Sequence, residues 1–314
     1  MERSDPRYQA YVEILKEELI PAMGCTEPIA LAYAAAKARE VLGMLPESVQ
    51  LQVSGSIIKN VKSVIVPNTG HLKGMEAAVA AGIIAGSADR ELEVISEVSE
   101  DKKAAIRDYL QTVPISIQHI EQGHVFDIIV TERSGDSYAK VRIAGFHTNI
   151  CLIEKNGRVL LSTYGNDVSI RAKAKAAAGS DARMNGCELP VIINSGSGTL
   201  SAYCGAVSAG AGAGAGIVYL CGDGYQAAIH TVVNALAIVS GIVCDGAKAS
   251  CAAKIASSVD AALLGYNMYK CHQEFKGGDG IVMKDIETTI KGIGRLGKDG
   301  MKETNEEIIR LMIE

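Results

Sequence analysis

Apolar residues recur at different spacings in the two halves of this sequence. In the first half, alternation with polar residues and short apolar runs predict β-strands at 49–53, 63–66, 115–120, 125–131, 138–143 and 148–153. The Asn156-Gly157 pair predicts a hairpin that leads from the last of these into a strand at 158–161. Beyond about residue 170 the alternation disappears, and Ala-rich segments predict helices at 171–178, 200–220, 225–240, 247–270, 285–295 and 304–313.

The first half also contains segments with helical periodicity. Tyr8, Val12, Leu15 and Leu19 form one apolar stripe, and further helices are predicted at 75–85 and 102–110. Thr26 is predicted to cap a helix with the body IALAYAAAKAREVL. We therefore predict an α+β fold in which an N-terminal α+β lobe, residues 1–168, packs on a mostly helical, Ala/Gly-rich C-terminal lobe, residues 169–314.

Composition and charge narrow the class of protein. The chain has 314 residues, with 31 Lys and Arg against 36 Asp and Glu, and no basic block with interleaved aromatics, so we expect no nucleic-acid partner. The first twenty residues lack a secretory signal, which indicates a cytoplasmic protein. Residues 202–220 carry no charge, but their Gly and Ala content predicts a tightly packed internal helix and no membrane partner. The GAGAGAG run within this segment predicts a close helix approach or a backbone that accommodates a ligand.

Eight cysteines in a cytosolic chain are expected to serve packing, metal binding or catalysis, because the cytosol keeps thiols reduced. Cys204, Cys244 and Cys251 lie in the helical half. The Asp245-Gly246 pair is expected to break the helix, which leaves Cys244 on a loop and Cys251 in the following first turns. Such a loop-plus-helix arrangement suits a site that gathers thiolates, although each of these residues also fits an ordinary buried cysteine. Zinc is disfavoured because the chain has no Cys-x-x-Cys pair.

Cys25 is predicted to lie just before a helix N-terminus. The positive end of the helix dipole lowers the pKa of a thiol at this position and increases the fraction of thiolate available as base, nucleophile or ligand. An ordinary half-buried cysteine at a turn is the alternative.

Polar turns supply further candidates for substrate binding. Asn68, Thr69 and Gly70 precede a predicted helix whose N–H groups are candidates to hold a carboxylate, and Lys73 adds positive charge. Asn194, Ser195 and Gly196 form a similar group of donors, and His147 precedes a predicted strand. Plain turns and a structural histidine are the alternatives.

Taken together, several motifs resemble the L-cysteine desulfidase family, which includes uncharacterised UPF0597-type proteins and is related to the iron–sulfur L-serine dehydratases. These motifs are PAMGCTEPIALAYAAAKA, NTGHLKGMEAA, FHTNICLI, DARMNGCELPVIINSGSG, LSAYCGAVSAGAGAGAG, SGIVCDGAKASCAAK and GGDGIVMKDIETTIKGIGRLGKDGM. They touch nearly the whole chain. Members of the family are longer, and this sequence lacks segments near 169/170 and 198/199.

The resemblance implies a function that the residues alone do not. It implies a [4Fe–4S] cluster on Cys204, Cys244 and Cys251, with Cys25 as proton acceptor. The implied activity is a PLP-independent α,β-elimination that converts L-cysteine to pyruvate, ammonia and hydrogen sulfide. An L-serine dehydratase, a non-catalytic cluster-binding sensor and a structural protein with incidental thiols remain alternatives. A small amino acid is the expected partner, and a homodimer is left open.

Overall fold

The computed structural model describes residues 25–163 and 201–313, and these residues form two compact units. The first, here called the sheet unit, comprises residues 25–163 together with Gly246–Lys248 and residues 308–313. The second, the helical unit, comprises residues 201–245 and 249–307. The two units together give the α+β fold that the hydrophobic pattern predicts.

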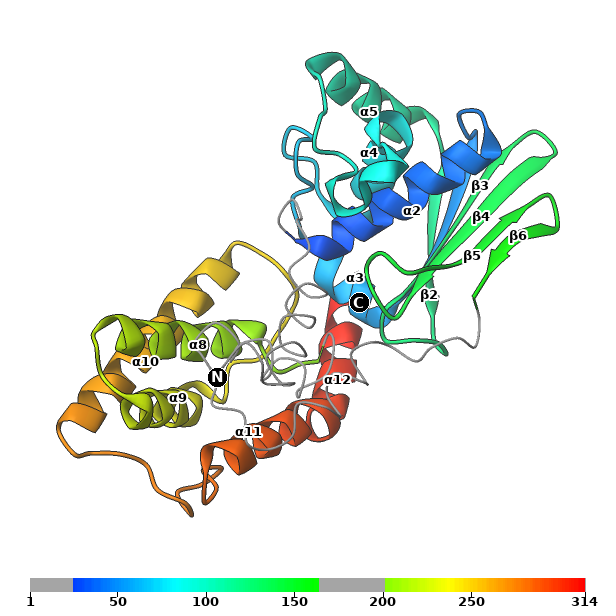
Figure 1. Ribbon diagram of the computed structural model, residues 1–314. Helices are drawn as coiled ribbons and strands as arrows, with labels where there is room; N and C mark the ends of the chain where they lie inside the picture. The colour runs from blue at the N-terminus through cyan, green and yellow to red at the C-terminus, as the bar shows by residue number, and fades with distance from the viewer. Residues whose placement is uncertain (1–24, 164–200, 314) are drawn as a thin grey trace, which may run out of the picture. The chain divides into compact units, whose positions relative to one another are not determined.

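The sheet unit is built on one six-stranded mixed sheet (Figure 1). The strands follow the order β2-β1-β3-β4-β5-β6, in which β1 and β2 are parallel and every other neighbouring pair is antiparallel. The Asn156-Gly157 turn between β5 and β6 has positive φ at both residues, as a tight hairpin requires. The strand bounds are β1 Ser48–Ser54, β2 Ile115–Ile120, β3 Asp127–Ser134, β4 Ser137–Ala144, β5 Ile150–Lys155 and β6 Arg158–Ser162.

Helices cover one face of this sheet. Helix α2 (Thr26–Leu42) packs on β3 and β4, and α4 (Gly74–Ala85) packs on the outer side of α2, next to α5 (Glu100–Thr112) (Figure 1). The body of α2 is rich in alanine and almost wholly buried, because it is enclosed between the sheet and α4. Buried positions alternate along most of β1 and β4, so that one face supplies the core beneath α2, whereas β3 is buried along most of its length. The N-terminus of α2 is thereby held rigidly at one end of the sheet.

The structure corrects three local predictions. Residues 63–66 form no strand, because only Ile65 makes a bridge, to Lys73, where the chain turns back on itself. A short buried helix, α3 (Gly55–Val61), follows β1 and was not predicted. Thr26 was predicted to cap α2 but is its first residue, and Cys25 occupies the N-cap.

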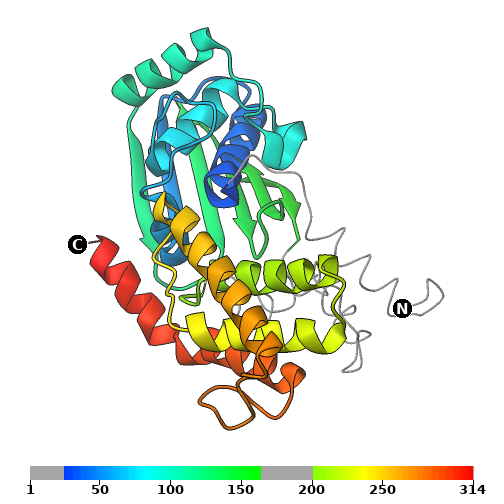
Figure 2. The ribbon, with the colours of Figure 1, turned by 90° about the vertical axis from the view of Figure 1, so that its left-hand side faces the viewer.

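The helical unit is a bundle of α8 (Gly205–Leu220), α9 (Tyr225–Val239) and α10 (Ser250–Lys270), which lie side by side (Figure 2). The chain continues through α11 (Ile286–Arg295) and the short helix η2 (Leu296–Gly300) into α12 (Lys302–Ile313). In the described part of the chain, no helix is both long enough and apolar enough to cross a membrane. The helices predicted around residues 8–19 and at 171–178 lie outside the described residues.

Small residues bring α8 and α10 into very close contact. A methyl group added at Gly210 would lie 2.4 Å from Cβ of Ser258, and one added at Gly214 would lie 2.4 Å from Cβ of Ala262. From the first contact to the second, the position moves four residues towards the C-terminus on both helices. The two helices therefore run in the same direction. The close helix approach predicted from the glycine run is therefore confirmed.

Candidate functional site

Cys204 and Cys244 lie on two short extended segments that pair with each other. Tyr203 and Val243 form an antiparallel bridge, the backbone N–H of Cys204 donates to the carbonyl of Ile242 at 3.2 Å, and the N–H of Cys244 donates to the carbonyl of Ala202 at 2.7 Å. Side chains alternate along extended chains, so the two thiols fall on the same face, as diagonal neighbours.

Cys251 comes to the same place through the register of the two parallel helices. Cys204 is the N-cap of α8, and Cys251 is the second residue of α10. The contacts of Gly210 with Ser258 and of Gly214 with Ala262 relate positions that are 48 residues apart. If the same spacing of 48 residues extends to the helix ends, Cys204 lies opposite residue 252, which immediately follows Cys251. Both cysteines therefore lie at the N-terminal ends of adjacent parallel helices, where the helix dipoles favour negative charge.

The three thiols interact electrostatically. Burial is the main reason that the pKa of Cys204 is raised, and negative charge on Cys244 and Cys251 raises it further. A backbone hydrogen bond from Ala206 and the charge of Lys254 act in the opposite direction. The group would hold several thiolates only with compensating positive charge.

Lys254 supplies such a charge and also links α10 to the segment that carries Cys244. One turn after Cys251, its Nζ donates to the carbonyl of Val243 at 2.9 Å and to Oδ1 of Asp245 at 2.6 Å. Burial lowers the pKa of Lys254, but Asp245 and the thiolates of Cys204 and Cys251 outweigh that effect and raise it overall. Lys254 therefore remains an ammonium group that ties α10 to the Cys244 segment.

This donor set fits an iron–sulfur cluster better than a single ion. Among the residues that the structure describes, no three His, Cys, Asp or Glu side chains converge to hold one metal ion. A cluster spreads its thiolate ligands over several irons, so its ligands need not meet at one point. The buried hydroxyl of Tyr203, beside Cys204, has no hydrogen-bond partner within the part of the chain that the structure describes, which fits a neighbouring group rich in acceptors. Cys204, Cys244 and Cys251 are the residues that would hold the cluster.

Cys25 belongs to a second polar group, in the sheet unit. Its thiol donates to Oε2 of Glu27 at 3.1 Å, and Oε1 of Glu27 accepts from Nδ2 of Asn60 on α3 at 3.0 Å. The Cys25 side chain accepts no capping hydrogen bond from α2. The N-cap thiol is therefore held by a carboxylate that a second helix orients.

His147 lies next to this group. Its Nε2 is 3.0 Å from the hydroxyl of Thr26, and its ring packs edge-on against Phe126, with ring centroids 4.5 Å apart. The structure thus brings together Cys25 and His147, two residues that the sequence identifies as candidates and that are separated by more than one hundred positions. Thr26 performs this linking role instead of the predicted capping.

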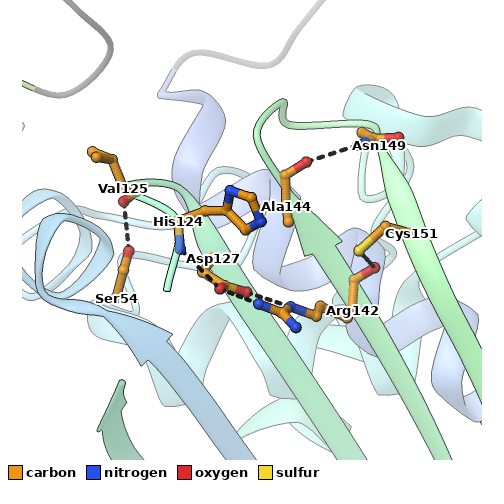
Figure 3. A network of polar contacts seen from close by, with 8 residues as sticks. All are labelled: Ser54, His124, Val125, Asp127, Arg142, Ala144, Asn149 and Cys151. Atoms are coloured by element: carbon orange, nitrogen blue, oxygen red, sulfur yellow. Dashed lines mark hydrogen bonds and ion pairs between the residues drawn. The ribbon is translucent and has the colours of Figure 1, made fainter. Parts of the chain in front are cut away.

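A network of polar contacts links the ends of β1, β3 and β4 (Figure 3). Buried Asp127, the first residue of β3, accepts from Nε of Arg142 at 2.8 Å and from the backbone N–H of His124 at 3.3 Å. Asn149 donates to the carbonyl of Ala144 at 2.8 Å, which closes the loop between β4 and β5. Ser54, at the end of β1, donates to the carbonyl of Val125 at 2.7 Å. These bonds hold the ends of β1, β3 and β4 together, and Asn149 belongs to the same β4–β5 connection as His147.

The loop predicted to bind a carboxylate uses its polar side chains internally. Thr69 is fully buried and donates to the carbonyl of Val66 at 2.7 Å, while Nδ2 of Asn68 donates to the carbonyls of Ile95 and Ser96. Gly70 has φ +70°, and a methyl group there would be 2.6 Å from Nη2 of Arg107. These contacts favour a structural turn. Lys73 is the residue before α4.

The remaining candidates, Asn194, Ser195 and Gly196, lie outside the described residues, and their role stays a prediction. The two groups of cysteines belong to different units, with Cys25 in the sheet unit and Cys204, Cys244 and Cys251 in the helical unit. Gly246–Lys248, between Cys244 and Cys251, are grouped with the sheet unit.

Comparison with known proteins identifies the family. Residues 198–310 match the family model of the serine dehydratase alpha chain. The chain is 49% identical to a UPF0597 protein of Desulfitobacterium hafniense, with 100% of this chain and 98% of the relative covered. UPF0597 proteins of Lachnoclostridium phytofermentans and Finegoldia magna are 40% and 38% identical, with at least 97% of each chain covered. The chain belongs to the UPF0597 family. No solved structure matches it.

The comparisons confirm, at the level of the family, the resemblance to the iron–sulfur serine dehydratases, and the preference for L-cysteine stays a prediction. The alignment with the Desulfitobacterium relative extends over 423 positions against 314 residues here, so at least 109 positions (423 minus 314) have no residue in this chain. The two predicted junctions, at 169/170 and 198/199, lie outside the described residues.

Sequence reasoning did not identify Glu27, Asn60 or Lys254. Glu27 stands two residues after Cys25 in the GCTEP motif, which was the available signal. Nothing in the sequence relates Asn60 to it, because their contact depends on how α3 packs. Lys254 follows Cys251 by three residues, a helical spacing that places the two on neighbouring positions of one face.

Proposed function

We propose that this UPF0597 protein is an iron–sulfur lyase that converts L-cysteine to pyruvate, ammonia and hydrogen sulfide. The observation that supports it most is the grouping of Cys204 and Cys251 at the N-terminal ends of α8 and α10, with Cys244 on the extended segment that pairs with the Cys204 segment. The match of residues 198–310 to the serine dehydratase alpha chain supports the same reaction type, an α,β-elimination from a small amino acid.

In this proposal the three cysteines hold a [4Fe–4S] cluster. When bound, the cluster would leave one iron without a protein ligand and supply Lewis-acid assistance to the departure of the substrate's sulfur. Lys254 balances the negative charge of the thiolates and keeps the Cys244 segment against α10. No PLP is required, because departure of the leaving group does not depend on a Schiff base.

Cys25 is proposed to remove the α-proton of the substrate. Its position before α2 favours the thiolate, and the hydrogen bond to Glu27 orients the sulfur. Loss of the proton and of the sulfur substituent gives aminoacrylate, which tautomerises to an imine and hydrolyses to pyruvate and ammonia. His147, beside Thr26, is a candidate to contact the substrate.

The test is purification without oxygen, followed by a visible spectrum, an iron determination and assays of sulfide and pyruvate from L-cysteine. We expect a brown protein with about four irons per chain and stoichiometric sulfide and pyruvate. A colourless protein after anaerobic reconstitution with iron and sulfide, without sulfide release, would refute the proposal.

The second candidate is an L-serine dehydratase with the same cluster, in which hydroxide is the leaving group. The description of the family model favours it directly. Parallel assays with L-serine and L-cysteine at equal concentrations separate the two by kcat/KM. A cluster-binding sensor predicts a coloured protein that consumes neither amino acid.

A further inference from the structure

Glu27 is the residue on which the polar group at the N-terminus of α2 is centred. The Cys25 thiol donates to its Oε2 at 3.1 Å, and Asn60 donates to its Oε1 at 3.0 Å. Both carboxylate oxygens are therefore held by side chains from different elements. This fixes the carboxylate against the sulfur and leaves it little freedom to turn away.

Such an arrangement is the usual means of activating a thiol or hydroxyl group, in which an acceptor touches the reactive atom and a third group orients the acceptor. We propose that Glu27 accepts the proton of Cys25 when the thiolate forms during turnover, with Asn60 as a positioning residue. This inference rests on the proposed role of Cys25 as the base.

The proton steps balance over one turnover. At rest the proton lies on sulfur, because a thiol is a weaker acid than a carboxyl group, and the hydrogen bond from Cys25 to Glu27 has that direction. The S–H bond of Cys25 breaks as an O–H bond forms on Glu27, and the thiolate then takes the α-proton of the substrate and becomes a thiol again. The carboxyl of Glu27 releases its proton to water, which restores the starting pair.

A purely structural role for Glu27 is the competing explanation. A carboxylate in the first turn of a helix favours the helix through the dipole, and Glu27 also links α2 to α3. Either role predicts some loss of stability on substitution. Only proton transfer predicts that the ionisation of Cys25 and the rate of turnover both respond to removal of the carboxylate's charge.

Other charged and titratable groups surround this end of α2. Among the described residues they include Lys59 on α3, His147 on the loop between β4 and β5, and the pair formed by Asp127 and Arg142 at the ends of β3 and β4. Lys248 follows Gly246, which packs on the backbone of Lys59. All of them are unchanged by a substitution at Glu27. A difference between wild type and variant therefore reports on the carboxylate itself.

The first experiment measures the thiol without substrate. Iodoacetamide alkylation of Cys25 is followed across pH by mass spectrometry of its peptide, in wild type, in Glu27→Gln and in Glu40→Gln. Glu40 is an exposed carboxylate on the same helix, paired with Lys37. Without the adjacent negative charge the thiolate forms more readily, so the Glu27→Gln profile should move to lower pH by about one unit, with Glu40→Gln unchanged. Superimposed profiles of wild type and Glu27→Gln overturn the inference.

The second experiment measures turnover of the cluster-loaded protein. At pH values below the ionisation of its Cys25, Glu27→Gln should lower kcat by about 10²- to 10⁴-fold with little change in KM, because no carboxylate then accepts the thiol proton, whereas Glu40→Gln keeps the wild-type rate. Full turnover by Glu27→Gln contradicts the inference. If Glu27→Gln does not fold, Asn60→Ala replaces it, because this variant keeps the carboxylate of Glu27 but removes the hydrogen bond that orients it. Asn60→Ala should lower kcat about tenfold, and an unchanged kcat would overturn the inference.

The two experiments separate this inference from the proposed function. The alkylation profile needs neither cluster nor substrate. Wild-type protein that consumes neither L-cysteine nor L-serine refutes the lyase proposal, while a shifted profile in the same preparation still supports proton sharing between Cys25 and Glu27.

Discussion

At the scale of single residues, the sheet unit contains a buried carboxyl group, that of Glu132. It is fully buried in β3, and among the described residues neither carboxylate oxygen has a hydrogen-bond partner. Burial raises its pKa well above the ordinary value of 4.5, and the charge of Arg39 on α2 only partly opposes this effect. The protein therefore keeps Glu132 protonated over a wider pH range than an unfolded chain would.

This gives a prediction for the pH dependence of stability. Between the ordinary pKa of 4.5 and the raised pKa of the folded state, the folded protein binds more protons than the unfolded chain, so its free energy of unfolding falls as pH rises. Glu132→Gln cannot titrate and should lack this decline. The Tm of Glu132→Gln minus the Tm of wild type should therefore increase from about pH 5 to about pH 8. Glu121→Gln, at an exposed site, should stay within about 0.5 kcal/mol of wild type at every pH. Parallel profiles of Tm against pH for Glu132→Gln and wild type would contradict the raised pKa of Glu132.

Lys254 permits a second prediction at this scale. Its ammonium group binds the carbonyl of Val243 and the carboxylate of Asp245, on either side of Cys244. Lys254→Met removes both bonds and the compensating charge, so the visible absorbance of the reconstituted protein should decay several-fold faster in air. Lys291→Met, elsewhere in the helical unit, serves as the control. Equal decay of the two variants would mean that Lys254 does not stabilise the site.

At the scale of elements, the sequence predicted most strands and helices because their patterns are local. The strand at 115–120 matches β2, and the Asn156-Gly157 hairpin is confirmed. Helix α3 was missed because GSIIKNV is short and apolar, and its helical form depends on complete burial. The strand predicted at 63–66 was wrong because the apolar run Val64-Ile65-Val66 lacks a neighbouring strand, a tertiary condition that the local sequence does not contain.

The packing of α8 against α10 gives a matched pair of variants. A methyl group at Gly214 would lie 2.4 Å from Cβ of Ala262, whereas nothing lies within 4 Å of the corresponding position at Gly216 on the same helix. Gly214→Ala should therefore lower stability by about 1–3 kcal/mol, because the helices must separate. Gly216→Ala should raise it by about 0.5–1 kcal/mol through the higher helix propensity of alanine. Thermal unfolding of both variants measures the difference, and equal effects would exclude the close approach.

At the scale of the whole molecule, the candidate site residues are divided between two units. The cysteines at 204, 244 and 251 gather within the helical unit, through a β-bridge and the register of two parallel helices. Cys25 belongs to the sheet unit. Sequence reasoning named these four cysteines, but it did not predict the parallel helices or the contact of Cys25 with Glu27, because both depend on packing between distant segments.

This division predicts that cluster binding and turnover can be lost independently. Cys25→Ala should keep the iron content and visible spectrum of wild type but lose turnover by at least about 10²-fold, because the proposed base is removed and the helical unit is unchanged. Cys244→Ala should lose most of the bound iron, and turnover with it, while the alkylation profile of Cys25 stays that of the cluster-free wild type. Iron determination, spectra and sulfide assays on both variants provide the measurement. Full turnover by Cys25→Ala would remove Cys25 from the reaction, and wild-type iron content in Cys244→Ala would remove Cys244 from the set of ligands.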